Sequence, residues 1–404
     1  MSDISYLDVK PPYRILLGPG PSNIHPRVQR AMIAPLVGHL DPYFGTVMDD
    51  TMSLLRFLFR TKNELTFPIS GPGSAGREAS LCNLLEPGDV AVIGVGGFFA
   101  DVMVENALRC GAEVIRVDAE WGRIVEPEAI EAALKAQKRV KLLALVHGES
   151  STGVLPPLTE ASQLAKQYGA LFLVDAVASL GGEEVAVDDW GIDICFSGSQ
   201  KCISSPPGLA PITVNQAALD ILKRRTHRVS SFFWDLLELS NYWAYNCDKV
   251  YHHTAPVNLV YALHEAVALI ADEGLEPCIQ RHHRHGLALQ AGLEAMGLTL
   301  HAQQGYRMNV LASVRIPAGI DDMRIRQRLL DEYSIEIWGG FGKLKGQIWR
   351  IGLMGFSSTE QNVLLVLFAL EKLLAEEGYP VEPGAGVTAA IRALRKEYRT
   401  VALS

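Results

Sequence analysis

Short, almost fully apolar runs alternate with helix-like runs through the first half of this chain. The apolar runs lie at 65–69, 91–94, 140–146, 170–174 and 192–196. Strands that are apolar on both faces are typical of a parallel sheet covered by helices on both sides. The alternation therefore predicts an α/β fold with a mostly parallel central sheet.

The length of the chain predicts more than one folding unit. A chain of 404 residues exceeds what one ordinary hydrophobic core supports. We expect an N-terminal arm over 1–22, a large α/β domain over 23–270, a smaller C-terminal α+β domain over 271–385 and a helical tail over 386–404. The basic side chains of the tail are expected to face solvent, namely Arg392, Arg395, Lys396 and Arg399.

Charge and hydropathy narrow the class of partner. A formal net charge of −8 with no basic block argues against nucleic acid or an anionic membrane as the main partner. The longest apolar run, 90–100, is well short of the roughly 20 residues that a membrane span needs. The N-terminus lacks the basic and apolar regions of a signal peptide, and the six cysteines form no C-x-x-C pair. Cytoplasm is therefore the expected location.

One lysine stands in an unusual loop. Lys201 lies within Ser197-Gly-Ser-Gln-Lys-Cys-Ile-Ser-Ser-Pro-Pro-Gly208, between expected strands at 192–196 and 209–214. Its neighbours are small and polar, so an amine there is well suited to forming an imine with a carbonyl. A solvated surface lysine is the alternative interpretation.

Polar residues follow the expected strands at the edge of the sheet where α/β folds bind ligands. His147-Gly-Glu-Ser150 and Asp175 each follow such a strand. The segment Ser70-Gly-Pro-Gly-Ser-Ala-Gly76 precedes a helix expected from Arg77 to Leu85. A glycine-rich loop that opens a helix can hold a phosphate, although such loops are often plain turns.

These residues match the needs of a cofactor that combines a phosphate ester, a pyridine ring and an aldehyde. The cofactor needs an imine-forming lysine, an acid for the ring nitrogen, a phosphate cradle and a stacking aromatic, and its substrate needs a cation for the carboxylate. The candidates are Lys201, Asp175, Gly73 with Ser74, Phe99 and Arg350. Asp175 could instead be a turn or cap residue, and Arg350 could form an internal salt bridge.

A series of motifs, in a fixed order, carries a family resemblance. They are Leu17-Gly-Pro-Gly-Pro-Ser-Asn23, Leu85-Glu-Pro-Gly-Asp89, His147-Gly-Glu-Ser-Ser-Thr-Gly-Val154, Val174-Asp-Ala-Val-Ala-Ser-Leu-Gly-Gly182, Ser197-Gly-Ser-Gln-Lys201, Tyr251-His-His-Thr254 and Arg350-Ile-Gly352. With these motifs the chain resembles the class V aminotransferases, a branch of the fold-type I pyridoxal-phosphate enzymes. It looks most like their alanine–glyoxylate and serine–pyruvate members.

The resemblance implies a role for each candidate residue. Lys201 would form the Schiff base with pyridoxal 5'-phosphate, and Asp175 would face the pyridine nitrogen. The other cofactor-binding residues would be Gly73, Ser74 and Gln200 at the phosphate, Phe99 and Val177 on the two ring faces, and Ser150 at the ring hydroxyl. Arg350 would bind the substrate carboxylate with Gly20 near it. Tyr251 and Thr254 would complete the phosphate site of the other subunit, which makes a homodimer obligatory.

The implied reaction is a ping-pong amino transfer from alanine or serine to glyoxylate or pyruvate, in which the amine of Lys201 moves the proton. An alternative is an (S)-ureidoglycine–glyoxylate aminotransferase of purine breakdown. Those enzymes carry Gln and Asn where this chain has His39 and Phe232, which favours the first interpretation.

Two further alternatives remain. A lyase or cysteine desulfurase on the same scaffold needs a mobile cysteine, and Cys202 and Cys247 are the candidates. The other is a Rossmann-like binding module in which Lys201 is an ordinary lysine. We expect no metal site, because Arg281-His-His-Arg-His285 reads as the solvated face of a helix.

Overall fold

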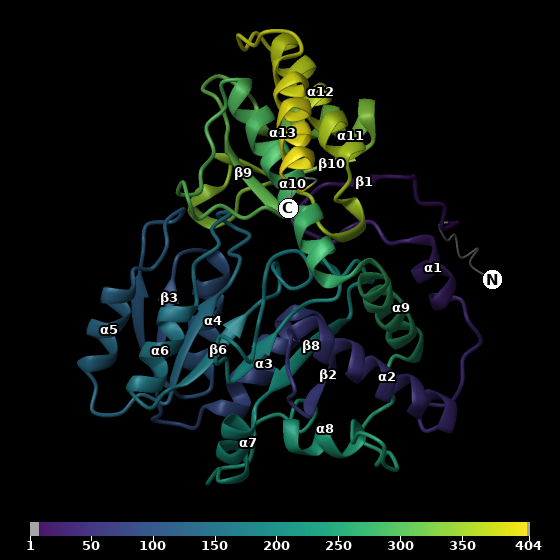
Figure 1. The fold of residues 1–404 in the computed structure, drawn as a ribbon. Helices are drawn as coiled ribbons and strands as arrows, with labels where there is room; N and C mark the ends of the chain where they lie inside the picture. Colours follow the sequence, from purple (N-terminus) through teal and green to yellow (C-terminus); the bar gives the residue numbers. More distant parts are fainter. Residues whose placement is uncertain (1–7, 402–404) are drawn as a thin grey trace, which may run out of the picture.

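The centre of the protein is a seven-stranded sheet with helices on both sides (Figure 1). The structure, a computed structural model, describes residues 8–401, with side chains as far as residue 396. The strand order is β2-β8-β7-β6-β5-β3-β4. The strands are β2 (Leu65–Ser70), β3 (Val90–Val95), β4 (Glu113–Asp118), β5 (Leu142–Val146), β6 (Leu171–Asp175), β7 (Ile194–Phe196) and β8 (Leu209–Val214).

The sheet is mostly parallel, as the apolar runs predict. The pairs from β4 through β3, β5 and β6 to β7 are parallel, whereas β8 is antiparallel to both β7 and β2. A parallel partner needs a crossover connection of about a dozen residues or more, usually a helix. The segment 197–208, which holds Lys201, contains no helix, so it returns the chain as an antiparallel neighbour.

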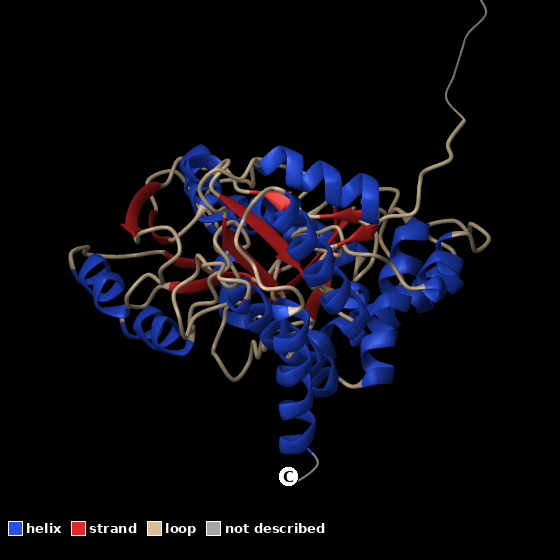
Figure 2. Cartoon of the chain, turned by 90° about the horizontal axis from the view of Figure 1, so that it is seen from above, coloured by secondary structure: helices blue, strands red, loops and turns tan. Residues whose placement is uncertain are grey.

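Helices from the first 273 residues cover the sheet, and Figure 2 shows them outside the strands. They are α1 (Pro26–Met32), α2 (Pro42–Phe59), α3 (Gly73–Leu84), α4 (Phe98–Arg109), α5 (Pro127–Lys135), α6 (Thr159–Gln167), α7 (Gln216–Lys223), α8 (Leu236–Tyr242) and α9 (Val257–Glu273). Between helices and sheet lies an apolar core in which Phe67, Phe172 and Phe196 are almost completely buried.

A smaller α+β part follows, at the top of Figure 1. Its helices are α10 (Leu275–Ala295), α11 (Asp322–Tyr333), α12 (Glu360–Glu376) and α13 (Ala385–Val401). An antiparallel sheet of order β11-β12-β9 joins Trp338–Gly339, Ile348–Gly352 and Leu311–Arg315. The short strands β1 (Ile15–Leu16) and β10 (Ile335–Glu336) pair in parallel and bring the N-terminal segment to this part. The exact domain boundaries given above stay predictions.

The helix α10 contributes to both hydrophobic cores. Leu275 and Cys278 belong to the core of the large sheet, whereas Ala288, Leu289 and Leu293 belong to the second core. The helix α13 packs along α10 and α12 and buries Ala390 and Leu394. Its basic residues Arg392, Arg395 and Lys396 are exposed as predicted, and the side chain of Arg399 lies outside the described residues.

Several sequence expectations need correction. The helix expected from Arg77 begins at Gly73 instead. The expectation that 281–285 forms a solvated face is wrong for two of its histidines. His282 and His285 are buried, since α10 packs against the segment 355–358, where His282 Nε2 accepts a hydrogen bond from Gly355 N at 2.9 Å.

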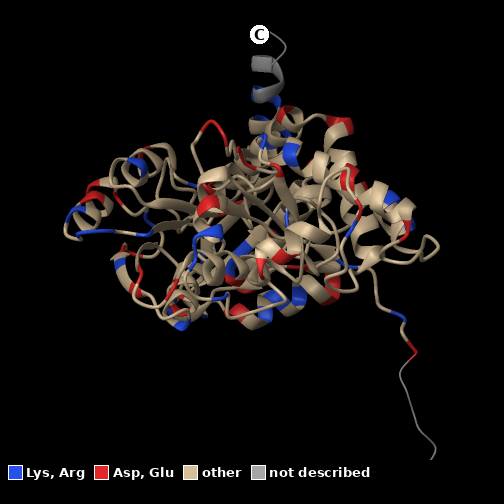
Figure 3. Ribbon diagram, turned by 90° about the horizontal axis from the view of Figure 1, so that it is seen from below, with Lys and Arg blue, Asp and Glu red and all other residues tan. Residues whose placement is uncertain are grey.

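Acidic and basic residues are interspersed over the face drawn in Figure 3. Within the described residues, no helix combines the length and apolar character needed to cross a bilayer. Among those same residues, no cluster of three or more His, Cys, Asp or Glu side chains is placed to hold a metal ion.

Candidate active site

A cavity of about 100 Å³ lies at the carboxyl ends of β5, β6 and β7. It brings together all the site residues predicted within one chain except Gly20 and Arg350, which lie beside it. The lining residues are Pro72, Gly73, Ser74, Arg77, Phe99, Val146, Gly148, Ser150, Asp175, Val177, Ala178, Gln200 and Lys201. Arg77, a buried cation, was missed by the sequence analysis.

Lys201 reaches the cavity from the loop between β7 and β8. Its side chain is buried, and burial together with the positive charge of Arg350 lowers the pKa of its amine to about 8. Nζ donates a hydrogen bond to the backbone oxygen of Pro19. About a tenth of the amine is therefore unprotonated at pH 7 and about half at pH 8, far more than for an ordinary lysine, and this is the form that can act as a nucleophile or base.

The N-terminal segment closes over this lysine. Gly20 has φ +99°, and a Cβ on it would lie 2.9 Å from Lys201 Nζ and 2.5 Å from Cδ. Ser22 Oγ donates to the backbone oxygen of Lys201 at 2.8 Å. Gly20 therefore lies against the lysine itself, and only a residue without a side chain fits there.

Asp175 is the last residue of β6 and is 3% exposed. Burial raises the pKa of its carboxyl to about 6, opposed by the charge of Arg77, a hydrogen bond from Val177 N and the charge of Lys201. Its Oδ1 accepts the Val177 N–H at 2.9 Å, as a turn residue would. Asp175 is thus a turn residue, and it is also placed as a candidate site residue because it lines the cavity.

The first turn of α3 has features that favour an anion. Gly73 and Ser74 open the helix after Pro72, whose side chain makes no cap hydrogen bond. A Cβ at Gly73 would lie 2.9 Å from Val177 Cγ2, so the backbone approaches the cavity closely. Free N–H groups, the positive end of the helix dipole and the nearby Arg77 all favour a phosphate. Gln200 Oε1 is buried with no hydrogen-bond partner among the described residues.

Arg350 lies in the middle strand of the smaller sheet and is completely buried. Nε donates to Gly339 O at 2.8 Å and Nη1 to Ser150 O at 3.2 Å, while Nη2 is buried with no partner among the described residues. No described carboxylate lies within 4.0 Å, which excludes the internal salt bridge in this part of the chain. Burial lowers the pKa of this guanidinium to about 10.

Aromatic rings border the space between Phe99 and Arg350. The guanidinium carbon of Arg350 is 4.1 Å from the ring centroid of Phe341. Phe341 in turn lies 6.2 Å from Phe99 and 5.1 Å from Phe98, centroid to centroid. Phe341 was not predicted from the sequence, because it comes from a loop far along the chain.

Tyr251 and Thr254 do not reach the cavity of their own chain. Both are exposed, Tyr251 by 60%, and the Tyr251 ring lies 5.4 Å from that of His39. Other large apolar side chains from the segments 33–43 and 232–251 are exposed as well, namely Ile33, Leu36, Tyr43, Phe232 and Val250. Such exposure on neighbouring chain segments is typical of a surface that meets a partner.

The chain belongs to the class V aminotransferase family. The model of that family, Aminotransferase class-V, matches residues 36–347. The protein is therefore a class V aminotransferase.

Relatives of two kinds are similar over almost the whole chain. The (S)-ureidoglycine–glyoxylate transaminase of Bacillus subtilis (strain 168) is 42% identical over 398 residues, 94% of this chain and 95% of the relative. The solved structure of ureidoglycine–glyoxylate aminotransferase from Bacillus subtilis covers 96% of this chain and 100% of its own, with 42% identity and a TM-score of 0.93. The structure of alanine–glyoxylate aminotransferase from Nostoc sp. covers 92% and 98%, with 45% identity and a TM-score of 0.89.

The family assignment sets aside the non-enzymatic binding module. For the desulfurase alternative, Cys202 is a poor nucleophile. It is 1% exposed, its Sγ lies 3.4 Å from Ala178 O, and burial raises the pKa of its thiol. Cys247 is exposed but does not line the cavity.

Proposed function

We propose that this aminotransferase moves an amino group from alanine or serine to glyoxylate or pyruvate, with pyridoxal 5'-phosphate bound in the cavity below Gly20. Arg350 carries this proposal. It is a buried guanidinium with an unpaired Nη2 and no carboxylate in contact, beside a lysine amine of lowered pKa. Its planar fork suits a substrate carboxylate in bidentate contact.

The residues of the cavity fit the cofactor. Gly73 and Ser74 with the first N–H groups of α3 would hold the phosphate, and the unsatisfied Gln200 lies beside them. Phe99 and Val177 would cover the two faces of the ring, with Ser150 at its hydroxyl. Asp175 would meet the ring nitrogen, and a positive ring would keep this buried carboxyl ionised. When bound, the cofactor supplies an electron sink for the substrate Cα.

The protein's own groups then direct the proton. Arg350 fixes the substrate carboxylate, so that the Cα hydrogen faces Lys201. Nζ of Lys201, with its pKa of about 8, would accept that proton as a general base and then, as the conjugate acid, release it again within the same half-reaction, so that the amine is regenerated for the second half-reaction. The buried N-terminal segment, with Pro19 and Gly20 against the lysine, excludes water from this transfer.

The same proposal includes a cytoplasmic homodimer with shared sites. The exposed Tyr251 and Thr254 would reach the phosphate of the partner subunit. Pairing of the exposed segments 33–43 and 232–251 between two chains would bury their apolar side chains.

A ureidoglycine donor is the second candidate, favoured by the 42% identity with the Bacillus subtilis relative. A ureido group needs hydrogen-bonding side chains to recognise it. This chain has His39, whose Nε2 is buried without a partner among the described residues, but Phe232 offers no such group. The residues therefore favour the small amino acids, and glyoxylate is the acceptor named for both kinds of relative.

The test is a panel of alanine, serine and ureidoglycine as donors against glyoxylate and pyruvate. We expect alanine or serine with glyoxylate to have the highest kcat/KM. Lys201→Ala should abolish turnover and the absorption band of the imine between the lysine and the cofactor. A preference for ureidoglycine by tenfold or more would contradict the proposal, as would an active Lys201→Ala protein.

Arg350→Lys separates carboxylate binding from folding. Lysine keeps the positive charge but loses the fork, so KM for glyoxylate is expected to rise by about tenfold to a hundredfold, with a smaller change in kcat. Steady-state kinetics at saturating donor measure this. An unchanged KM would remove Arg350 from the substrate site.

A further inference from the structure

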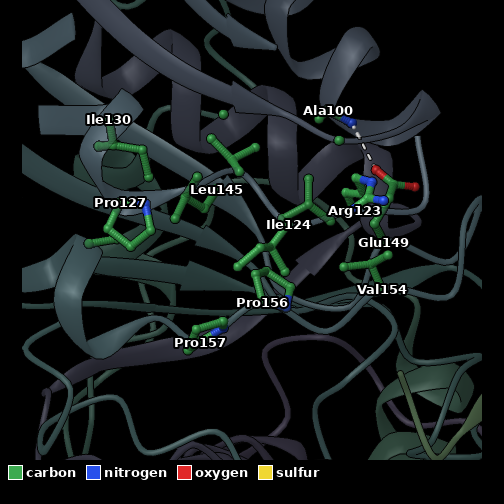
Figure 4. A pocket seen from close by; sticks show the side chains of 15 residues that line it. Ala100, Arg123, Ile124, Pro127, Ile130, Leu145, Glu149, Val154, Pro156 and Pro157 are labelled. Carbon is green, nitrogen blue, oxygen red and sulfur yellow. Dashed lines mark hydrogen bonds between the residues drawn. The ribbon is translucent and has the colours of Figure 1, made fainter. Parts of the chain in front are cut away.

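Glu149 is a buried carboxyl group that the proposed mechanism does not use. It follows β5 in the segment 147–153 and is 4% exposed. Figure 4 shows it at one end of a second cavity, of about 40 Å³, which is otherwise mostly apolar. Ala100, Arg123 and Val154 also line this cavity near Glu149.

The carboxyl group joins two segments that carry candidate site residues. Its Oε2 accepts the backbone N–H groups of Phe99 and Ala100, each at 3.2 Å. Its Oε1 accepts Ser151 N at 3.1 Å and Ser151 Oγ at 2.6 Å. Glu149 thus caps the start of α4, which carries Phe99, and ties it to the segment that carries Ser150.

Gly97 lets Glu149 and Ser151 approach the start of α4 closely, because it has no side chain. A Cβ on Gly97 would lie 2.3 Å from Glu149 Cγ and 2.6 Å from Ser151 Oγ. Ser151 Oγ also accepts the Phe98 N–H at 2.9 Å. The first turn of α4 is therefore held by two side chains of one neighbouring loop, which leaves little freedom for the Phe99 backbone.

Glu149 also affects the charge state of Arg350, although the two side chains share no hydrogen bond. Arg350 Nη1 donates to the backbone oxygen of Ser150, the residue next to Glu149. The negative charge of Glu149 raises the pKa of Arg350 and so opposes the effect of burial. A carboxylate in direct contact would occupy the guanidinium fork, whereas one at longer range stabilises the charge and leaves the fork free.

We propose that Glu149 is a positioning residue for the amino transfer, which fixes Phe99 over the cofactor site and keeps Arg350 charged for the substrate carboxylate. This proposal rests on the proposed role of Arg350. The groups around the carboxyl are the N-terminus of α4 and Ser151, which donate to it, and the charges of Arg350 and Asp175, with Arg123 at the same end of the small cavity.

The ionised state of Glu149 depends on opposing effects. Burial raises the pKa of its carboxyl to about 7, the hydrogen bonds from Ser151 and Ala100 lower it, and the charge of Asp175 raises it. Above neutral pH the carboxylate is the main form, so its charge supports Arg350 in the range where Arg350 itself begins to lose its proton.

The experiment compares Glu149→Gln with Glu183→Gln in the holoenzyme. Glutamine keeps the size of the side chain but removes the charge. Glu183 is a matched control, since it is 4% exposed and accepts hydrogen bonds from Asn309 N, Asn309 Nδ2 and Val310 N outside the site. Kd for glycolate, a carboxylate without a reactive carbonyl, is measured from pH 6.5 to 10 by calorimetry, beside kcat and KM for glyoxylate.

We expect Glu149→Gln to weaken glycolate binding about tenfold at pH 8. The loss of binding at alkaline pH should begin about one pH unit lower than in the wild type, because a missing negative charge lowers the pKa of Arg350. KM should rise more than kcat falls. Glu183→Gln should leave this alkaline limb, the fall of glycolate binding at high pH, at the same pH as in the wild type, even if the variant lowers the melting temperature.

Two outcomes overturn the proposal: an unchanged alkaline limb in Glu149→Gln, or an equal shift in Glu183→Gln. If Glu149→Gln does not fold, Glu149→Asp takes its place. Aspartate keeps the charge on a shorter side chain, so the limb should stay while kcat falls as Phe99 moves, and a shifted limb would contradict the role. Glycolate binding does not depend on which oxo acid is the acceptor, so failure of glyoxylate turnover alone would overturn only the proposed function.

Discussion

At the residue scale, the candidate site gathers buried charged groups that form no salt bridge with any described residue. Asp175, Glu149, Lys201 and Arg350 are all at least nine-tenths buried, and each pKa is shifted toward the neutral form by burial. If these positions served only the stability of the fold, we would expect such groups to be paired or replaced by apolar side chains. Retained buried charges of this kind are typical of functional sites.

Asp175 should make the cofactor-free protein less stable as pH rises. The pKa of its carboxyl is raised from 3.8 to about 6 in the folded chain, so the folded state binds more protons than the unfolded state between these values. The stability contributed by the neutral carboxyl is therefore present below pH 3.8 and is lost as pH rises through about 6. Asp175→Asn does not titrate and avoids this loss.

The measurement is the melting temperature of the cofactor-free Asp175→Asn and wild-type proteins from pH 4.5 to 7.5. The difference, variant minus wild type, is expected to increase with pH and to level off above about pH 7. Every other titrating group is common to both proteins and cancels to first order. A difference that stays constant with pH would show that Asp175 has an unshifted pKa.

At the element scale, the apolar runs predicted the strands of the large sheet except β4, but they did not predict α4. The run 90–100 reads as one apolar segment, yet Gly96 and Gly97 divide it into β3 and α4. The paired glycines were the available signal, followed by Ala100, Met103 and Ala107 at helical spacing. The consequence is functional, because Phe99 then lies in the first turn of a helix that Glu149 can cap.

Other parts of the site depend on contacts between segments distant in sequence. Lys201, Asp175 and Arg350 were predictable because each is a charged residue at an apolar strand or in a loop of small residues. Arg77, Phe341 and Glu149 look ordinary in the sequence. Their importance comes from burial and from neighbours that only the folded chain brings together, such as Phe341 at 4.1 Å from Arg350.

The helix α10 joins the two hydrophobic cores at a close contact. A Cβ on Gly286 would lie 2.3 Å from the backbone oxygen of Asn309 and 2.6 Å from its Cα. Backbone atoms cannot rotate away, so Gly286→Ala should separate the helix from this segment and destabilise the protein by about 1–3 kcal/mol or more.

Gly45→Ala is the matched control. Gly45 also lies inside a helix, α2, but a Cβ there would meet only Lys249 side-chain atoms, at 3.8 Å or more. Alanine should therefore be neutral or stabilise the protein by up to about 1 kcal/mol through helix propensity. Urea unfolding of the three proteins measures the difference. Equal stabilities of the two variants would show that the Gly286 contact can relax.

At the scale of the whole molecule, the cavity of one chain is surrounded by only part of the predicted site residues. Lys201 lines the cavity and Arg350 lies beside it, whereas Tyr251 and Thr254 are exposed on the outer surface. If two chains share their sites, the lysine of one chain works with Tyr251 and Thr254 of the other. That arrangement predicts complementation between two inactive or weakened variants.

The complementation experiment mixes Lys201→Ala chains with chains that carry both Tyr251→Ala and Thr254→Ala. Each hybrid dimer then has one site with both defects and one site with none. Random exchange at equal amounts makes half of the dimers hybrids, so activity should recover to about a quarter of the wild-type value. The chains are exchanged by partial unfolding and refolding with excess cofactor, and each variant treated alone is the control. Sites built within a single chain would give no intact site in any hybrid, so activity no greater than the average of the two controls would refute shared sites and leave Tyr251 and Thr254 as ordinary surface residues.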